Sequence, residues 1–375
     1  MKDLKMCDLN GQYQKIKPEI DAAIQKVLDS TAFIKGPEVG TFEKDLAEYL
    51  GVKHVIGCAN GTDALQVALM ALGLKPGDEV ITTNFTFIAT IEVVELLRLK
   101  PVIVDVDPDT FLIDIESIKK AITPKTKAII PVHLFGQNAD MEQISLLAQQ
   151  HNIAIVEDCA QSIGSDYIFK NNTKKKSGTI GQIGCTSFFP SKNLGCYGDG
   201  GAIYTDCDQL AEEIRCICNH GMKTRYYYET LGINSRLDTI QAAILQVKLK
   251  HLDAYNAARL AVADYYDKFL GKIKGIKIAK RVLNSTQIYH QYTFRVLNGK
   301  RDALKKHLEE NGVPVMIYYP VPLHLQNAYK HLGYKAGDFP VTEMLCQEVL
   351  SLPVHTEMNE EQLAFITNQI QKFYN

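Results

Sequence analysis

The chain has 375 residues, 46% hydrophobic and 22% charged, so it holds enough apolar material for a sizeable core. Its 41 basic and 43 acidic side chains give a formal charge of −2, which excludes a general attraction to nucleic acid or to an anionic membrane. We expect a cytoplasmic protein, because the first ten residues lack a signal-like apolar stretch and no segment reaches the roughly 18 apolar residues of a membrane helix.

The first two thirds of the chain alternate short β-branched segments with segments of helical spacing. Buried strands are predicted at residues 79–82, 101–106, 127–132 and 152–156. Apolar residues at i, i+3, i+4 and i+7 predict a helix over residues 65–72 and another after an Asp140 cap. We therefore expect a mostly parallel sheet with helices on both faces, and ligands beyond the carboxyl ends of its strands.

The pattern changes in the last third of the chain. A long helical pattern over residues 238–270 leads into a lysine-rich stretch. After it we predict a strand at 291–297, a helix at 301–311, a strand at 313–319 and two further helical segments. This predicts a large domain over residues 1–250 and a smaller C-terminal α+β domain over residues 251–375. The short Lys174–Lys176 run is interpreted as a solvated loop tip.

The first segment with chemical potential is Cys58-Ala-Asn-Gly-Thr-Asp-Ala-Leu65, a turn of small residues that opens an amphipathic helix. Free backbone N–H groups at such a helix start, with the Thr62 hydroxyl, form an anion site suited to a phosphate. An ordinary capped helix has the same pattern. The segment is neither a Walker loop nor a dinucleotide fingerprint, so it does not support nucleoside triphosphate or dinucleotide binding.

An aromatic pair follows the strand at residues 79–82, in the segment Asn84-Phe-Thr-Phe-Ile-Ala-Thr90. Phe87 in this pair is suited to stack on a flat heteroaromatic ring. A phenylalanine of the core would leave the same signal in the sequence.

Asp158 falls just past the carboxyl end of the predicted strand 152–156. A lone carboxylate in that place is costly unless it meets a cation. A protonated pyridine nitrogen would supply the cation, and the ion pair would keep the ring positive and able to accept electrons. A helix N-cap at Asp158, with Gln161 and Ser162 as turn residues, fits the local pattern equally well.

The longest informative segment runs from Thr186 to Ala202 and contains Lys192 among small and aromatic residues, before a Gly-Asp-Gly-Gly turn. Partial burial lowers the pKa of a lysine because the charged form loses hydration. The neutral amine can then attack an aldehyde and form a Schiff base. Taken alone, Lys192 is also compatible with a surface lysine on a flexible loop.

Together these segments provide a phosphate cradle, a stacking face, an acid for a pyridinium and an imine-forming lysine, which pyridoxal 5'-phosphate requires. The order of these motifs and their residues resemble the DegT/DnrJ/EryC/StrS family of sugar-nucleotide aminotransferases. The resemblance extends from the Gly-Pro-Glu turn at 36–38 to Ser-Leu-Pro at 351–353. The resemblance implies an α/β protein with the aspartate-aminotransferase fold (fold type I). It also implies a homodimer with active sites at the subunit interface.

The resemblance assigns cofactor roles residue by residue. Lys192 matches the Schiff-base lysine and proton shuttle, Asp158 the pyridinium partner, and Gln161 the residue near the ring hydroxyl. The remaining cofactor contacts match Gly61, Thr62 and Ser187 (phosphate), Phe87 (stacking), and Asn234 (phosphate, from the neighbouring subunit). The implied reaction is a ping-pong transamination in which L-glutamate leaves its amino group as pyridoxamine phosphate. A ketone on a nucleotide-linked sugar then takes up that group while Lys192 moves the proton.

The segments around Cys58, Lys192 and Asn234 are similar to aminotransferases acting on UDP-2-acetamido-2-deoxy-3-oxo-glucuronate. Those enzymes make a 3-amino uronic acid for bacterial surface polysaccharide, such as the O-antigen of lipopolysaccharide. In that branch an arginine matching Arg236 meets the acidic sugar, as a guanidinium can through two parallel hydrogen bonds. A His-Tyr pair lies close by in that branch, whereas this chain has Tyr318 and Tyr319. His324 is a further candidate for contact with the sugar nucleotide.

Alternatives remain at this stage. Aminotransferases of dTDP-3-oxo-6-deoxyhexoses share most of these motifs, and Arg236 is equally suited to a diphosphate. A non-catalytic regulatory protein with the same fold would show a degraded cofactor set, and no member is missing here. A sugar dehydratase of this fold would carry His in place of Lys192.

The cysteines and two histidines are interpreted as structural. The nine cysteines include no CxxC pair, so we expect free thiols and no zinc site. Cys196 need not be reactive although it lies near Lys192 in the sequence. His133 and His220 are assigned to a strand end and a loop, and no metal is expected.

Overall fold

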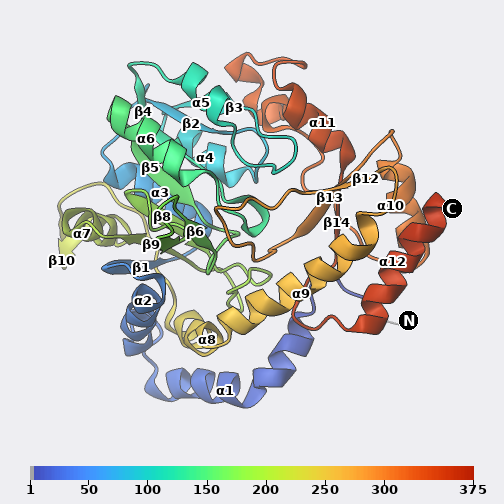
Figure 1. Ribbon diagram of the computed structural model, residues 1–375. Helices are drawn as coiled ribbons and strands as arrows, with labels where there is room; N and C mark the ends of the chain where they lie inside the picture. Colours follow the sequence, from blue (N-terminus) through green and yellow to red (C-terminus); the bar gives the residue numbers. More distant parts are fainter. Residues whose placement is uncertain (1–3) are drawn as a thin grey trace.

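The computed structural model describes residues 4–375 and consists of a larger and a smaller region joined by helices (Figure 1). The larger region is built on a seven-stranded sheet with strand order β1-β9-β8-β5-β4-β2-β3. Its strands are β1 (His54–Cys58), β2 (Glu79–Thr83), β3 (Lys100–Val104), β4 (Thr126–Ile130), β5 (Ala154–Asp158), β8 (Ile183–Ser187) and β9 (Gly201–Thr205). Pairs from β8 through β3 are parallel, whereas β9 is antiparallel to β1 and β8. The expected mostly parallel α/β sheet is confirmed.

Helices cover both faces of this sheet. Val80 and Val156 face one helical layer, whereas their neighbours Ile81 and Ile155 face the other. Because successive side chains of a strand point to opposite faces, the apolar strands are buried on both sides. The first layer contains α3 (Gly61–Ala71), α4 (Ala89–Leu96) and α7 (Asp208–Ile217), and the second contains α5 (Ile115–Ala121) and α6 (Met141–His151).

Capping residues fix where two of these helices begin. The Asn60 side chain accepts a hydrogen bond from the Asp63 amide, so α3 begins directly after β1. The Asp140 carboxylate accepts one from the Gln143 amide and caps α6 as expected. Such caps satisfy amides that have no partner inside the helix.

Three further helices lie against the larger region: α1 (Leu9–Ser30), α2 (Pro37–Leu50) and α8 (Thr239–Leu249). The smaller region has its own core around the antiparallel strands β12 (Ile276–Ile278), β13 (Tyr292–Val296) and β14 (Val349–Leu352). Its helices are α9 (Leu252–Leu270), α10 (Arg301–Glu310), α11 (Pro340–Glu348) and α12 (Glu360–Tyr374). Because α8 ends and α9 begins around residues 250–251, we propose domains over residues 1–250 and 251–375.

Several predicted elements differ from those observed. The helical pattern of residues 238–270 forms two helices that separate at Lys250 and His251, where no proline or glycine marks the break. The strand predicted at 313–319 is wrong: the segment makes one isolated bridge, Met316 with Ser351. Pro314 and Pro320 lack the amide protons that a longer ladder needs.

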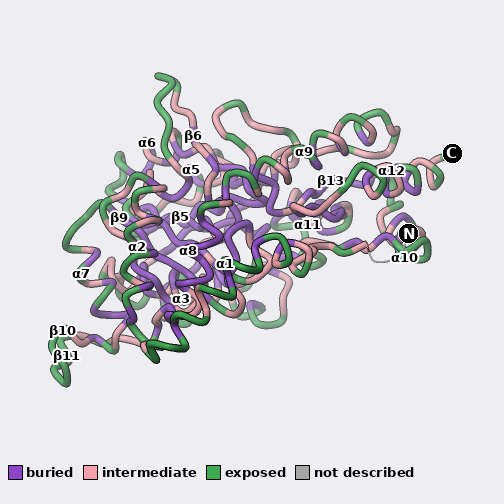
Figure 2. Tube along the Cα trace, turned by 90° about the horizontal axis from the view of Figure 1, so that it is seen from below, coloured by how far each residue is buried: buried purple, intermediate pink, exposed green. Residues whose placement is uncertain are grey.

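Two short hairpins complete the fold. The first pairs β6 (Asp166–Ile168) with β7 (Lys174–Lys176), so the lysine run expected at a loop tip is a strand. The second pairs β10 (Met222–Thr224) with β11 (Tyr227–Tyr228) and extends away from the buried body of the molecule (Figure 2). No helix within residues 4–375 combines the length and the apolar character needed to cross a bilayer.

Candidate active site

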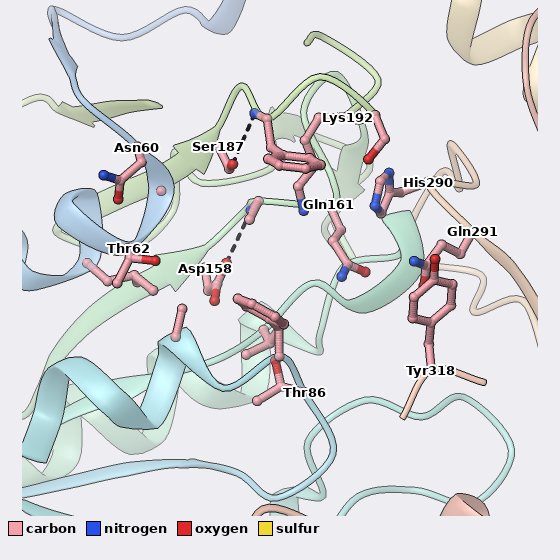
Figure 3. Close-up of a pocket in the computed structure, with 18 of the residues that line it drawn as sticks. Asn60, Thr62, Thr86, Asp158, Gln161, Ser187, Lys192, His290, Gln291 and Tyr318 are labelled. Atoms are coloured by element: carbon pink, nitrogen blue, oxygen red, sulfur yellow. Dashed lines mark hydrogen bonds between the residues drawn. The ribbon is translucent and has the colours of Figure 1, made fainter. Parts of the chain in front are cut away.

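A cavity of about 610 Å³ lies beyond the carboxyl ends of β5 and β8, beside the N-terminus of α3 (Figure 3). Parallel strands that end at one edge bring their last side chains together, so the position is the one expected for an α/β sheet. Nine of the residues singled out in the sequence line it: Gly61, Thr62, Phe87, Asp158, Gln161, Ser187, Lys192, Tyr318 and Tyr319.

Lys192 projects its amine into this cavity from the loop that follows β8 (Figure 3). Burial lowers the pKa of Lys192 from 10.5 to about 8, because the ammonium loses hydration there. The negative charge of Asp158 acts in the opposite direction and raises that pKa. At neutral pH a fraction of the amine, on the order of a tenth, is therefore in the nucleophilic neutral form.

Asp158 is the last residue of β5, and only 6% of it is exposed. Its carboxylate accepts hydrogen bonds from the Thr90 hydroxyl at 2.8 Å and the Ala160 amide at 3.1 Å. These two donors orient the carboxylate toward the cavity and leave acceptor capacity for a further N–H group. The arrangement suits a protonated ring nitrogen.

The start of α3 forms a narrow cradle against the end of β8. A Cβ atom on Gly61 would lie 2.6 Å from the Cβ of Ser187, so only glycine allows this approach. The N-terminus of α3 presents free amides beside the Thr62 and Ser187 hydroxyls. This combination of helix terminus and hydroxyl groups fits a phosphate.

Gln161 is fixed by two hydrogen bonds. Its Oε1 accepts from the Phe135 amide at 2.7 Å, and its Nε2 donates to the Tyr319 hydroxyl at 3.2 Å. Burial raises the pKa of Tyr319 and, to a smaller extent, that of Tyr318, so both phenols keep their protons at neutral pH. Phe87 is 56% exposed on the cavity wall, which leaves its ring free to stack.

Asn234, Arg236 and His324 do not line this cavity. Asn234 is exposed, and Arg236 lines a second cavity of about 450 Å³ together with Lys35 and Arg215.

The expectation that His324 approaches the substrate is not supported by this geometry. Its imidazole is 1% exposed, lies 2.7 Å from the Asn84 amide nitrogen, and lies 3.2 Å from a Glu343 carboxylate oxygen. These contacts anchor His324 inside the protein, away from the cavity that holds Lys192.

Several cavity residues were not singled out in the sequence, among them His290 and Gln291. Both belong to the segment that leads into β13, and no motif marked them because their surroundings read as an ordinary strand. Burial, with the nearby charges of Lys192 and Arg259, lowers the pKa of His290 well below 6.5, so its imidazole is neutral.

His133, interpreted from the sequence as structural, lies with Glu157 and Cys159 at distances that a metal ion could bridge. The donor and acceptor atoms of this cluster are already engaged. His133 Nε2 contacts Glu157 at 2.9 Å, and its Nδ1 accepts from the Ala139 amide. The Glu157 carboxylate also accepts three backbone hydrogen bonds from residues 178–181, so the cluster is a hydrogen-bonded core element.

The geometry of the main cavity fits pyridoxal phosphate. The glycine cradle would accommodate a phosphate, the carboxylate of Asp158 would pair with a ring nitrogen, and the amine of Lys192 opens into the same cavity. The glycine cradle matches neither the Walker loop of nucleoside triphosphate sites nor the fingerprint of dinucleotide sites.

The chain was compared with known proteins. A family model described as the DegT/DnrJ/EryC1/StrS aminotransferase family matches residues 14–371. A "Pleiotropic regulatory protein" of Geobacillus stearothermophilus is 47% identical over 99% of both chains. A "UDP-2-acetamido-2-deoxy-3-oxo-D-glucuronate aminotransferase" of Pseudomonas aeruginosa is 46% identical over 97% of this chain and 98% of its own. A "dTDP-3-amino-3,4,6-trideoxy-alpha-D-glucose transaminase" of Streptomyces venezuelae is 39% identical over 98% and 95%.

Solved structures show the same relationship. S. venezuelae DesV, in complex with a ketimine intermediate, superposes with a TM-score of 0.96 at 38% identity, over 100% of this chain and 99% of that one. NtdA from Bacillus subtilis, with bound cofactor pyridoxamine phosphate, gives 0.88 at 33% identity, over 96% and 82%. The cofactor expectation is confirmed at the level of the family. This chain belongs to the DegT/DnrJ/EryC1/StrS aminotransferase family and is an enzyme of that class.

Proposed function

We propose that the chain transfers an amino group from L-glutamate to a nucleotide-linked keto sugar, with pyridoxal phosphate as cofactor and pyridoxamine phosphate as the form that carries the amino group. The observation that carries this proposal is the shared cavity of Lys192 and Asp158, with the pKa of Lys192 lowered to about 8. A surface lysine would keep its charge and could not act as a nucleophile at neutral pH.

In this proposal each end of the cofactor has its own ligands. Gly61, Thr62 and Ser187 hold the phosphate, Asp158 pairs with the ring nitrogen, and Gln161 lies near the ring hydroxyl. Phe87 stacks on the ring. When bound, the cofactor supplies an aldehyde for the amine and a ring that withdraws electrons.

Lys192 is proposed to carry the proton during amino transfer. Its amine accepts a proton when neutral and returns it when charged, and a pKa near 8 allows both at neutral pH. The carboxylate of Asp158 is held in place by the hydrogen bonds from Thr90 and Ala160.

We propose that two copies of the chain form a homodimer with shared active sites. Asn234 and Arg236 lie outside the cavity of their own chain, which supports a role for them in the cavity of another copy. Exposed apolar side chains flank the second cavity and form the tip of hairpin β10–β11; they include Phe33, Ile34, Tyr226, Tyr227, Tyr228 and Leu231. Exposed apolar clusters of this kind are typical of protein–protein interfaces.

We propose UDP-2-acetamido-2-deoxy-3-oxo-glucuronate as the acceptor, with the amino group added at C3 for surface polysaccharide. The 46% identity to the P. aeruginosa enzyme and the presence of Arg236 support this choice. Arg236 of a second copy would pair with the sugar carboxylate, and Tyr318 and Tyr319 would contact the sugar as uncharged donors. His324 does not take part in these proposed contacts. The cytoplasm is the proposed location, where nine free thiols such as these stay reduced.

A dTDP-3-oxo-6-deoxyhexose is the second candidate acceptor. Tyr318 favours it, because the phenol carries no charge for a uronate carboxylate, and the S. venezuelae relative acts in that sugar class by its name. A regulatory role is a third reading, prompted by the name of the G. stearothermophilus relative.

The proposal is tested by spectroscopy and substrate trials. The purified protein with bound cofactor should change its visible absorbance when L-glutamate is added, and each matching keto sugar should restore the first spectrum. UDP-linked uronates and dTDP-linked deoxyhexoses are compared as acceptors. Absence of any change with glutamate would favour the regulatory reading, whereas turnover of dTDP sugars alone would favour the second candidate.

A further inference from the structure

The loop that carries Lys192, residues 188–200, is held tightly by its own backbone. The Lys192 amide donates to the Phe189 carbonyl at 2.8 Å, and the Cys196 amide donates to the Phe188 carbonyl at 2.8 Å. A Cβ on Gly195 would lie 2.4 Å from the Pro190 carbonyl oxygen, so the chain folds back on itself without room for a side chain. The carbonyl group of Gly195 lies on the outer side of this turn.

Lys248 on α8 meets that carbonyl. Its side chain is 1% exposed, and its ammonium donates to the Gly195 carbonyl oxygen at 2.5 Å. The same ammonium lies 5.2 Å from the centre of the Tyr197 ring. Within residues 4–375 we find no carboxylate in an ion pair with it.

A buried lysine without a carboxylate is costly, because its charge loses hydration without an opposing charge. Burial and the charge of Arg259 lower the pKa of Lys248 to about 8, while Cys196 and Cys7 act in the opposite direction. A methionine would fill the same space without that cost. The contact that offsets the cost here is the charge-assisted bond to Gly195, three residues after Lys192.

The loop has a second anchor at Asn193, the residue directly after Lys192. The side-chain Nδ2 of Asn193 donates to Asn256 Oδ1 at 2.7 Å and to the Ile288 carbonyl at 3.1 Å. Asn193 thus ties the loop to α9 and to the segment before β13, and Lys248 ties it to α8. The two anchors lie within three residues of Lys192 along the chain.

We propose that Lys248 is a positioning residue for Lys192: its ammonium fixes the Gly195 carbonyl and thereby the loop that aims the Lys192 amine into the cavity. The inference rests on the proposed role of Lys192. Lys248 itself touches neither substrate nor cofactor, so its effect passes through the backbone of residues 193–195.

The test replaces Lys248 by Met, which is also unbranched, is one atom shorter and removes the donor. In the full-length protein, amide hydrogen exchange of residues 193–198 should become at least about tenfold faster, the effect of losing a hydrogen bond to a charged group. In the protein with bound cofactor, the pH midpoint of the visible absorbance should also shift. Lys250→Met is the matched control, because Lys250 is exposed two residues later and should change neither readout.

The outcomes separate positioning from simple stabilisation. A lower melting temperature with unchanged exchange in 193–198 and an unchanged absorbance midpoint would overturn the proposal. Should the Met variant not fold, Lys248→Gln is judged by the same criteria, since it keeps an uncharged donor one atom shorter and should give intermediate exchange. Faster exchange in a protein that binds no cofactor would support the anchor and refute the proposed function instead.

Discussion

The cavity that holds Lys192 and the cavity lined by Arg236 satisfy their charged groups in different ways. In the first, Asp158 accepts bonds from Thr90 and Ala160, and its charge acts on the Lys192 amine. In the second, Arg236 forms no hydrogen bond or ion pair with residues 4–375, and its Nε is buried without a partner. A buried guanidinium nitrogen without a partner is costly. The charged groups of the first cavity therefore interact within one chain, whereas Arg236 in the second cavity keeps a nitrogen without a partner in its own chain.

The largest expected effect is the loss of the reactive amine in the first cavity. Lys192→Ala should lower amino transfer by at least about 10³-fold, because it removes both the nucleophile and the group that moves the proton. The protein should still fold and retain the cofactor by its phosphate. Steady-state assays with glutamate and the accepted keto sugar measure the change, and activity within tenfold of wild type would contradict the assigned role.

The next effect tests the charge that faces Lys192. Asp158→Asn should lower the rate of amino transfer by about 10²-fold, because it removes the charge that would stabilise the cofactor ring. It should also lower the pKa of Lys192 below about 8, since the carboxylate raises that pKa in the wild type. An amine reacts only when deprotonated, so labelling of Lys192 in cofactor-free protein should begin at lower pH in the variant. A midpoint that stays unchanged would show that the two groups do not interact.

A smaller effect is expected in the second cavity. Arg236→Ala should lower kcat/KM for a sugar uronate by about 30-fold, the loss of hydrogen bonds between charged groups. The melting temperature should stay near the wild-type value, because the guanidinium has no partner within residues 4–375. Lys272→Ala, an exposed change in the smaller region, is the control and should alter neither quantity.

The same variant shows which chain Arg236 serves. Mixing Arg236→Ala with Lys192→Ala protein should restore about a quarter of wild-type activity, because half of the dimers are hybrids with one intact site. Activity no greater than the sum of the separate variants would place Arg236 in the cavity of its own chain and refute the shared site.

The sequence predicted the first cavity well because its residues lie at strand ends and helix starts. Asp158 follows a run of buried apolar residues, and Gly61 opens a helix, so sheet geometry alone brings them to one edge. His290 and Gln291 were missed because they reach the cavity from the smaller region, and local spacing carries no information on how the two regions meet. The proline-flanked segment at 313–319 was assigned to a strand because its apolar content outweighed the missing amides.

Residues of the second cavity were harder to place for a different reason. The family resemblance assigns Asn234 to the cofactor phosphate of a neighbouring subunit and Arg236 to the sugar or its diphosphate, and both residues lie outside the cavity of their own chain. Residue spacing in a sequence reports on contacts within one chain. A residue that acts on a second copy makes no such contact, so the spacing does not predict its position. His324 was misplaced because its contacts with Asn84 and Glu343 join segments more than 200 residues and about 20 residues apart.

The most direct measurement identifies the lysine that bonds to the cofactor. Borohydride reduction of the protein with bound pyridoxal phosphate fixes the cofactor on its lysine, and digestion with mass spectrometry locates it. The label is expected on the peptide that contains Lys192, in a ratio of one per chain. A label on Lys248 or on any other lysine, with Lys192 unmodified, would contradict the active site described above.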